Sequence, residues 1–372
     1  MIRYIKQWYQ KRFVNNEPAI FLLLSGLVVL TITFFGHLIA PVLAGLVIAF
    51  LLDIIVVFLT RYLCLKRWAS VYLVFTCFLA LVILAVIFIF PIIFRQLGQF
   101  LQNVPDLFET FKNNLYYLSE QYPSIFPSEQ MHEFVRTIST VQLDRISDVG
   151  QSLLRWSLNS IPMFISWLVY IFLVPLVVFF FLKDKDSMIT WVKQTFMPNE
   201  NGALIEVWQE VKPQLGNYVK GKVIEFFIVA ALSYVAFIYF NMNYALLLSV
   251  LVGASVFIPY IGMIVVTVPV VLIAVGQFGF SGEFIWVVGS YFVIQFFDGN
   301  ILFPILFSEA VNIHPIAVIM AILVFGGFWG FWGLFFAVPL ATLIKAGLNM
   351  WVRHKQIKGQ QESANNQSIQ GV

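Results

Sequence analysis

Charged residues are scarce in this chain of 372 residues: they make up 11% of it, against 60% hydrophobic residues. Soluble domains carry roughly 25% charged residues, so the composition excludes an ordinary soluble protein. Only two cysteines occur, Cys64 and Cys77, beside or within apolar segments, which argues against a disulfide framework or a cysteine-based metal site. The net charge of +3 comes without a basic tract, so we expect no nucleic-acid partner.

Catalytic signatures are also missing. The sequence holds no Gly-x-Ser-x-Gly elbow, no His-Glu-x-x-His pair and no P-loop, and only four histidines. These absences predict that the protein is not an enzyme and needs no cofactor or metal. Any transport it performs is then secondary or passive.

Apolar segments long enough to cross a bilayer, about 20 residues each, dominate the chain. Ala19 to Phe35 and Leu38 to Leu59 predict a hairpin of two spans around a Gly36-His37 turn, followed by spans at about 68–94 and 161–182. Basic residues flank alternate ends of these spans, at 61–67 and at Lys183. The positive-inside rule therefore predicts a multi-pass protein of the plasma membrane with both termini in the cytoplasm.

The chain divides by composition into six parts. We expect N-terminal transmembrane helices over 1–94, a small helical extracytoplasmic insertion over 95–160, a transmembrane helix over 161–182, a cytoplasmic amphipathic segment over 183–222, a transmembrane core over 223–351 and a disordered tail over 352–372. The amphipathic segment fits a helix on the membrane surface and equally a connector helix packed on the bundle.

The core over 223–351 is interrupted three times, at 256–262, at 298–300 and at the glycines between 326 and 333. Backbone broken at membrane depth is tolerated only where it is buried in protein or lines a watery cavity. The fold class that follows is all-α and polytopic, with about eight crossings and with broken or re-entrant helices in the C-terminal half.

Asp298 is the leading candidate for a transport pathway. An ionisable group at membrane depth is costly and usually faces a cavity or a partner. Gln295 and Asn300 would place two amides beside its carboxylate. The alternative is a helix cap or an interfacial acid.

Pro259, Tyr260 and Gly262 form the second candidate group, because two half-helices that meet there would expose polar backbone ends to a substrate or cation. A plain proline kink is the alternative. Glu309 fits a pathway or, more simply, a solvated loop. Asp53 fits snorkelling, pairing with Arg61 or an ion path. Structural hinges or close helix packing are expected at four glycines: Gly326, Gly327, Gly330 and Gly333.

Several of these motifs resemble the autoinducer-2 exporter family, also described as PerM-type permeases. The early motifs are Pro41 with Gly45, Ala49-Phe-Leu-Leu-Asp53 and Phe179-Phe-Phe-Leu-Lys-Asp184; the later ones are Pro259-Tyr-Ile-Gly262, Pro269, Asp298-Gly-Asn-Ile-Leu-Phe-Pro304, His314-Pro315, Gly326-Gly327, Gly330 to Gly333 and Ala337-Val-Pro339. The resemblance implies a multi-pass transporter with an extracytoplasmic insertion after the third span. It implies export of a signalling molecule in some relatives and sodium or lithium/proton antiport in others.

Three functions stay open on the sequence. The first is a permease for a small polar solute, the second a sodium or lithium/proton antiporter, and the third a membrane scaffold whose outer segment binds a partner. The expected partners are a small polar solute or cation and the lipid bilayer, with a homo-oligomer plausible from the 17% of aromatic residues.

Overall fold

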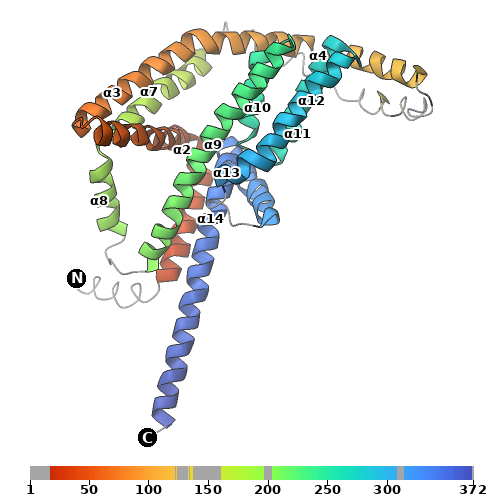
Figure 1. Ribbon diagram of the computed structural model, residues 1–372. Helices are drawn as coiled ribbons and strands as arrows, with labels where there is room; N and C mark the ends of the chain where they lie inside the picture. Colours follow the sequence, from red (N-terminus) through yellow and green to blue (C-terminus); the bar gives the residue numbers. More distant parts are fainter. Residues whose placement is uncertain are drawn as a thin grey trace. The chain divides into compact units, whose positions relative to one another are not determined.

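The computed structural model (Figure 1) describes residues 17–121, 161–196, 203–307 and 314–370, with single positions at 123, 133, 135 and 136. These residues form helices and no strands, which confirms the all-α class. Six of the helices are long and apolar enough to cross a membrane. The figure of eight crossings stays a prediction. Two compact units divide the chain: unit 1 (1–74, 170–220 and 307–372) and unit 2 (75–169 and 221–306).

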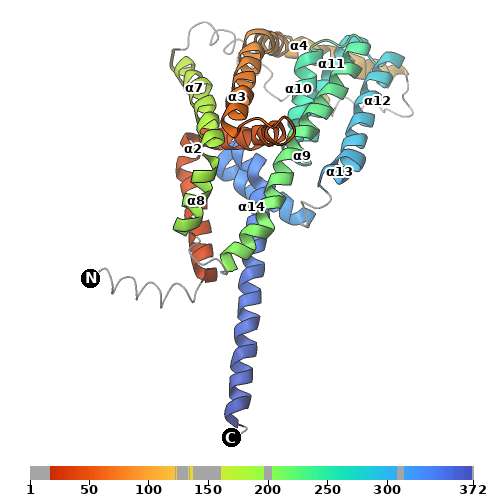
Figure 2. The same ribbon diagram turned by 60° about the vertical axis from the view of Figure 1, so that its left-hand side comes forward.

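Unit 1 begins with one long helix instead of the predicted hairpin. Helix α2 runs without interruption over Glu17–Tyr62 and contains Pro41. In both Figure 1 and Figure 2 it changes direction along its length, as proline-containing helices often do. The prediction of a turn at Gly36-His37 is wrong, because a glycine permits a turn without imposing one, and a continuous helix pairs most of its backbone groups within itself.

The next helices follow the predicted segments more closely. α3 (Arg67–Leu84) leads through the π-helical turn η2 (Ala85–Ile89) into α4 (Phe90–Gln121), so the chain stays helical across residue 94, where the insertion was expected to start. Helix α7 (Ile161–Lys183) matches the predicted fourth span, and α8 (Lys185–Phe196) follows it. Most of the insertion beyond Gln121 lies outside the described residues.

Helix α9 (Ala203–Tyr239) joins the amphipathic segment to the following span in a single element. Within unit 1 two residues of the apolar stripe on this amphipathic segment, Val211 and Tyr218, are buried, and Val211 packs with Ala346 and Leu343. A stripe covered by protein supports the connector-helix alternative over a helix lying on the membrane surface.

Unit 2 packs the second part of α9 with α10 (Ala245–Ser255), α11 (Ile261–Phe278) and α12 (Gly282–Phe297), which continues through the π-helical turn η3 (Asp298–Leu302) into α13 (Phe303–Phe307). Large buried side chains such as Phe237, Leu248 and Tyr291 form its core. Helix α4 is fastened to this core by side-chain hydrogen bonds: Asn103 Nδ2 donates to the Tyr244 hydroxyl at 2.8 Å, and the Leu247 N–H donates to Gln96 Oε1 at 2.9 Å.

The last helix, α14 (Pro315–Gln370), reverses at Gly330, which has φ 58° and ψ −135°. This confirms the predicted break in the final apolar stretch. The helix also continues to Gln370, whereas the sequence predicted a disordered tail from residue 352. The tail 352–372 holds five Gln, two Lys and one Glu, residues that favour helix even without an apolar face.

Candidate functional site

A buried ion pair lies on α9. Lys222 and Glu225 are three residues apart, one helical turn, and their charged groups approach to 2.7 Å. Each residue is only 2% exposed. The Lys222 ammonium also donates a hydrogen bond of 2.7 Å to the carbonyl of Val256 and lies 5.5 Å from the centre of the Phe303 ring. The ammonium is thus held by a carboxylate, a carbonyl and an aromatic face.

Asp298 completes the cluster from the first position of η3. Its carboxyl lies within hydrogen-bonding reach of the Glu225 carboxyl and also interacts with the Lys222 charge. One of its oxygens, Oδ1, is buried without a hydrogen-bond donor among the described residues. Asp298, the leading candidate from the sequence, therefore has a charged partner. A helix cap or an interfacial acid, the alternative left open by the sequence, would not need one.

The cluster lies well inside two segments that are long and apolar enough to cross a membrane. The span on α9 covers Val211–Tyr239, so Lys222 and Glu225 are both more than ten residues from either end. Asp298 lies within the span Gly282–Phe307, nine residues before its end. The division predicted from composition ends the cytoplasmic segment at residue 222 and starts the transmembrane core at residue 223, which would place Lys222 and Glu225 near the membrane interface. Helix α9 continues through both residues, and their depth in the bilayer stays a prediction.

The predicted break after α10 supplies the carbonyl that holds Lys222. Helix α10 ends at Ser255 and α11 starts at Ile261, so the Val256 carbonyl is not used by a continuous helix. Gly262 makes the junction possible, because a Cβ there would overlap the backbone carbonyl of Ser255.

Tyr260 adopts φ 64° and is 58% exposed, so its ring points away from the packed core. Pro259 accepts a backbone hydrogen bond from Ile261 across the turn.

The two amides expected beside Asp298 have different environments. Gln295 is 7% exposed and donates to the Tyr291 hydroxyl at 3.1 Å, which in turn shares a 2.7 Å hydrogen bond with Thr267. It extends the polar region one turn from Asp298. Asn300 is exposed and donates to the carbonyl of Phe296 in its own helix, so it does not join the cluster. The segment also stays helical, as a π-turn, where a break was expected; such turns are frequent at functional sites.

The remaining candidates lie elsewhere. Asp53 pairs with Lys185 at 2.5 Å and with Arg67 at 3.7 Å, which are other partners than the Arg61 of one alternative left open by the sequence. Glu309 lies outside the described residues. Of the four glycines, Gly326 and Gly333 allow close packing against Leu334 and the Phe325 carbonyl, Gly330 adopts a positive φ, and Gly327 meets open space.

This arrangement can hold a small cation. With all three groups ionised, two carboxylates and one ammonium carry a net charge of −1, and an uncompensated charge is expensive in an apolar environment. One proton or one monovalent metal ion makes the cluster neutral. Among the described residues no group of three or more His, Cys, Asp and Glu side chains could hold a metal ion by itself, so the cluster is not built as a multivalent metal centre.

Sequence comparison identifies the family. Residues 19–353 match the family described as AI-2E family transporter. The "Putative permease PerM" of Escherichia coli (strain K12) is 40% identical over 354 residues, covering 94% of this chain and 98% of the relative. The "Putative transport protein YueF" of Bacillus subtilis (strain 168) is 22% identical over 85% of this chain and 84% of its own, and "Putative transport protein YrrI" of the same organism is 23% identical over 71% and 72%. The chain is a membrane protein that belongs to the AI-2E family of transporters.

Proposed function

We propose that this transporter moves a small polar solute by secondary transport, and that the Lys222–Glu225–Asp298 cluster binds the coupling cation. The class of transporter follows from the family. The sequence contains no P-loop through which ATP hydrolysis could supply energy. An ion gradient is then the available source of energy for uphill transport.

The observation that carries the proposal is the charge imbalance of the cluster. Lys222 and Glu225 are 2% exposed, and Asp298 brings a second carboxyl group to the same ammonium. A purely structural ion pair needs one group of each sign, because every additional buried charge adds a desolvation cost. The second carboxylate is useful if the cluster gains and loses one positive charge during the transport cycle.

The break at 256–260 links this exchange of cations to the backbone. Lys222 is bonded both to Glu225 and to the Val256 carbonyl at the end of α10. A cation that binds to the carboxylates competes with the ammonium for them. The strength of the bond to Val256 would change with occupancy, and the junction between α10 and α11 would respond.

Exchange of sodium or lithium for protons is the second candidate function. The same net charge of −1 favours it, because one site that is neutralised by either cation can bind only one of them at a time. In that case the transported species are the cations themselves, and no organic solute is required. A membrane scaffold would need neither activity.

Proton flux in sealed proteoliposomes distinguishes the two candidate functions. The purified protein is reconstituted with an internal pH dye and challenged with sodium or lithium pulses, beside the Asp298→Asn variant. Antiport predicts cation-dependent changes of internal pH that fall to the background of empty vesicles in Asp298→Asn, since the amide removes the second carboxylate. Cation-coupled solute transport predicts little pH response while the solute is absent.

Glu283→Gln is the matched control, because it removes an exposed carboxylate from the first turn of the same α12 helix. It should keep the flux of the parent protein. Equal flux in Asp298→Asn and the parent would refute the role of the cluster. Absence of flux from every variant would exclude antiport, and the solute would then be sought by comparing metabolites inside and outside cells with and without the protein.

A further inference from the structure

The reversal of α14 at Gly330 creates a hairpin with two arms in unit 1. The first arm holds the 15 residues 315–329, and at about 1.5 Å per residue it rises about 22 Å. This is short of the ~30 Å hydrocarbon core of a bilayer. Gly326 and Gly333 bring the arms into close contact near the tip. A hairpin of this length fits a re-entrant element that enters the bilayer and returns to the same side.

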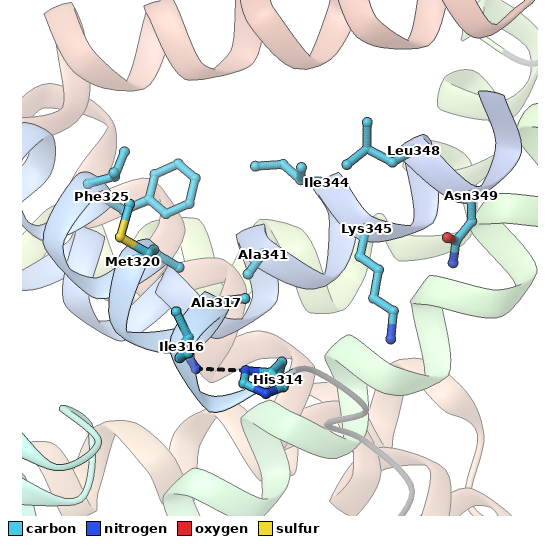
Figure 3. A pocket seen from close by; sticks show the side chains of 12 residues that line it. His314, Ile316, Ala317, Met320, Phe325, Ala341, Ile344, Lys345, Leu348 and Asn349 are labelled. Carbon is cyan, nitrogen blue, oxygen red and sulfur yellow. Dashed lines mark hydrogen bonds between the residues drawn. The ribbon is translucent and has the colours of Figure 1, made fainter. Parts of the chain in front are cut away.

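Away from the tip the arms enclose a groove of about 940 Å³. Figure 3 shows it lined along its length by apolar side chains of both arms, among them Met320 and Phe325 from the first and Ile344 and Leu348 from the second. Met320, Ile344 and Leu348 remain about half exposed, at 55%, 45% and 49%. The groove is therefore open along its side, as a site for a long apolar chain would be.

One end of the groove is polar and basic. His314, Lys345 and Asn349 line this end, where Leu348 is the last apolar side chain (Figure 3). His314 Nδ1 accepts a hydrogen bond of 3.3 Å from the Ile316 N–H, which leaves Nε2 as the ring nitrogen that can donate. An ammonium, an imidazole and a carboxamide are all hydrogen-bond donors to phosphate oxygens, and the lysine adds positive charge.

The length of the groove favours a ligand with an acyl chain over a free polar solute. On the first arm the lining extends from Ile316 to Phe325, which corresponds to about 14 Å along a helix. One leaflet of a ~30 Å core is about 15 Å deep. The groove thus matches one acyl chain in length, with the basic end at the level where that leaflet's phosphates lie. A free polar solute would match the basic end but leave the long apolar wall without a partner.

We propose that this groove is a binding site for an anionic phospholipid, with an acyl chain between the arms of the α14 hairpin and its phosphate at Lys345, His314 and Asn349. The basic residues Arg353 and Lys355 follow in the sequence and predict a cytoplasmic location for this end. Anionic lipids of the cytoplasmic leaflet are attracted by such positive charge. The site is independent of the Lys222–Glu225–Asp298 cluster.

Native mass spectrometry of the delipidated full-length protein tests the site. The protein is titrated with phosphatidylglycerol and with phosphatidylcholine of the same chains. We expect one phosphatidylglycerol to bind more tightly than phosphatidylcholine, and Lys345→Gln to weaken it about tenfold through the loss of one charge-assisted contact. Lys345→Arg should retain binding. Lys183→Gln, which removes a cation at the end of α7, should leave it unchanged.

Two further measurements distinguish a bound phospholipid from a small phosphate compound. Met320→Trp fills the groove at a half-exposed position and should weaken the binding of both lipids. Glycerol phosphate, which carries the headgroup chemistry without a chain, should not displace the bound lipid. Equal affinity for the two lipids, equal affinity in Lys345→Gln and the parent, or displacement by glycerol phosphate would each overturn the proposal.

Discussion

Two charged groups of side chains, one in each unit, differ in burial and in balance. In unit 2, Lys222 and Glu225 have side chains only 3% and 2% exposed, and Asp298 leaves the cluster with an excess negative charge. In unit 1, Asp53 and Asp186 face Arg67 and Lys185, two charges of each sign, and the exposed fractions of their side chains are 14%, 75%, 38% and 36%.

This difference separates two uses of charge in a membrane protein. A balanced and partly exposed network holds helices together at small cost, and it needs no further ion. A buried and unbalanced cluster is costly to form and gains stability from any cation that enters it. On this argument the network of unit 1 fastens α2, α3 and α8, whereas the cluster of unit 2 is suited to bind and release an ion.

Removal of the only cation from the buried cluster should have the largest effect on stability. Lys222→Ala leaves two carboxyl groups facing each other without the ammonium, and breaking a buried pair in this way costs about 3–5 kcal/mol. We expect a large fall in the unfolding temperature of the protein in detergent. The measurement is thermal unfolding followed by intrinsic fluorescence.

A double variant checks that the loss comes from uncompensated charge. Lys222→Ala combined with Glu225→Ala removes one charge of each sign and should be more stable than Lys222→Ala alone. If the double variant loses the sum of the two single effects, the two side chains do not interact and the cluster is wrongly assigned.

The junction that positions the cluster should be the next most sensitive feature. Gly262→Ala places a Cβ against the backbone carbonyl of Ser255, which cannot move as a side chain could, and overpacking of this kind costs about 1–3 kcal/mol. Gly289→Ala in α12 meets no atom within 4 Å and serves as the control. Equal unfolding temperatures for the two variants would contradict the close contact between α10 and α11.

How far the sequence predicts this site depends on the kind of signal. Pro259 and Gly262 predicted the break correctly, because their backbone restrictions act locally. Asp298 was identified because a lone acid in an apolar segment is costly. Lys222 and Glu225 were missed because charges usually mark the end of a span, and only the fold shows that α9 continues through them. The signal available in the sequence was their spacing of three residues, which places two opposite charges on one face of a helix.

The long helices α2 and α14 also show that a local sequence pattern does not by itself fix where a helix ends. The Gly36-His37 pair predicted a hairpin where α2 is continuous, while the glycines around Gly330 predicted a reversal that does occur. A glycine permits both outcomes, so composition alone does not separate them. At Gly330 the two arms have close-packing glycines at Gly326 and Gly333, a tertiary feature that rewards the reversal.

The partly exposed network of Asp53, Arg67, Lys185 and Asp186 should respond least to mutation and most to salt. Lys185→Gln removes the 2.5 Å partner of Asp53 but leaves Arg67 beside it, so we expect a loss of at most about 1 kcal/mol. Because the Debye length shrinks from about 10 Å at 0.1 M salt to about 3 Å at 1 M, the difference from the parent should nearly vanish at high salt. Unfolding temperatures of both proteins at the two salt concentrations provide the measurement. The deficit of Lys222→Ala should persist at 1 M, since its charges are shielded from the solvent ions. A salt response of the same size in both variants would remove the distinction between a partly exposed network and a buried cluster.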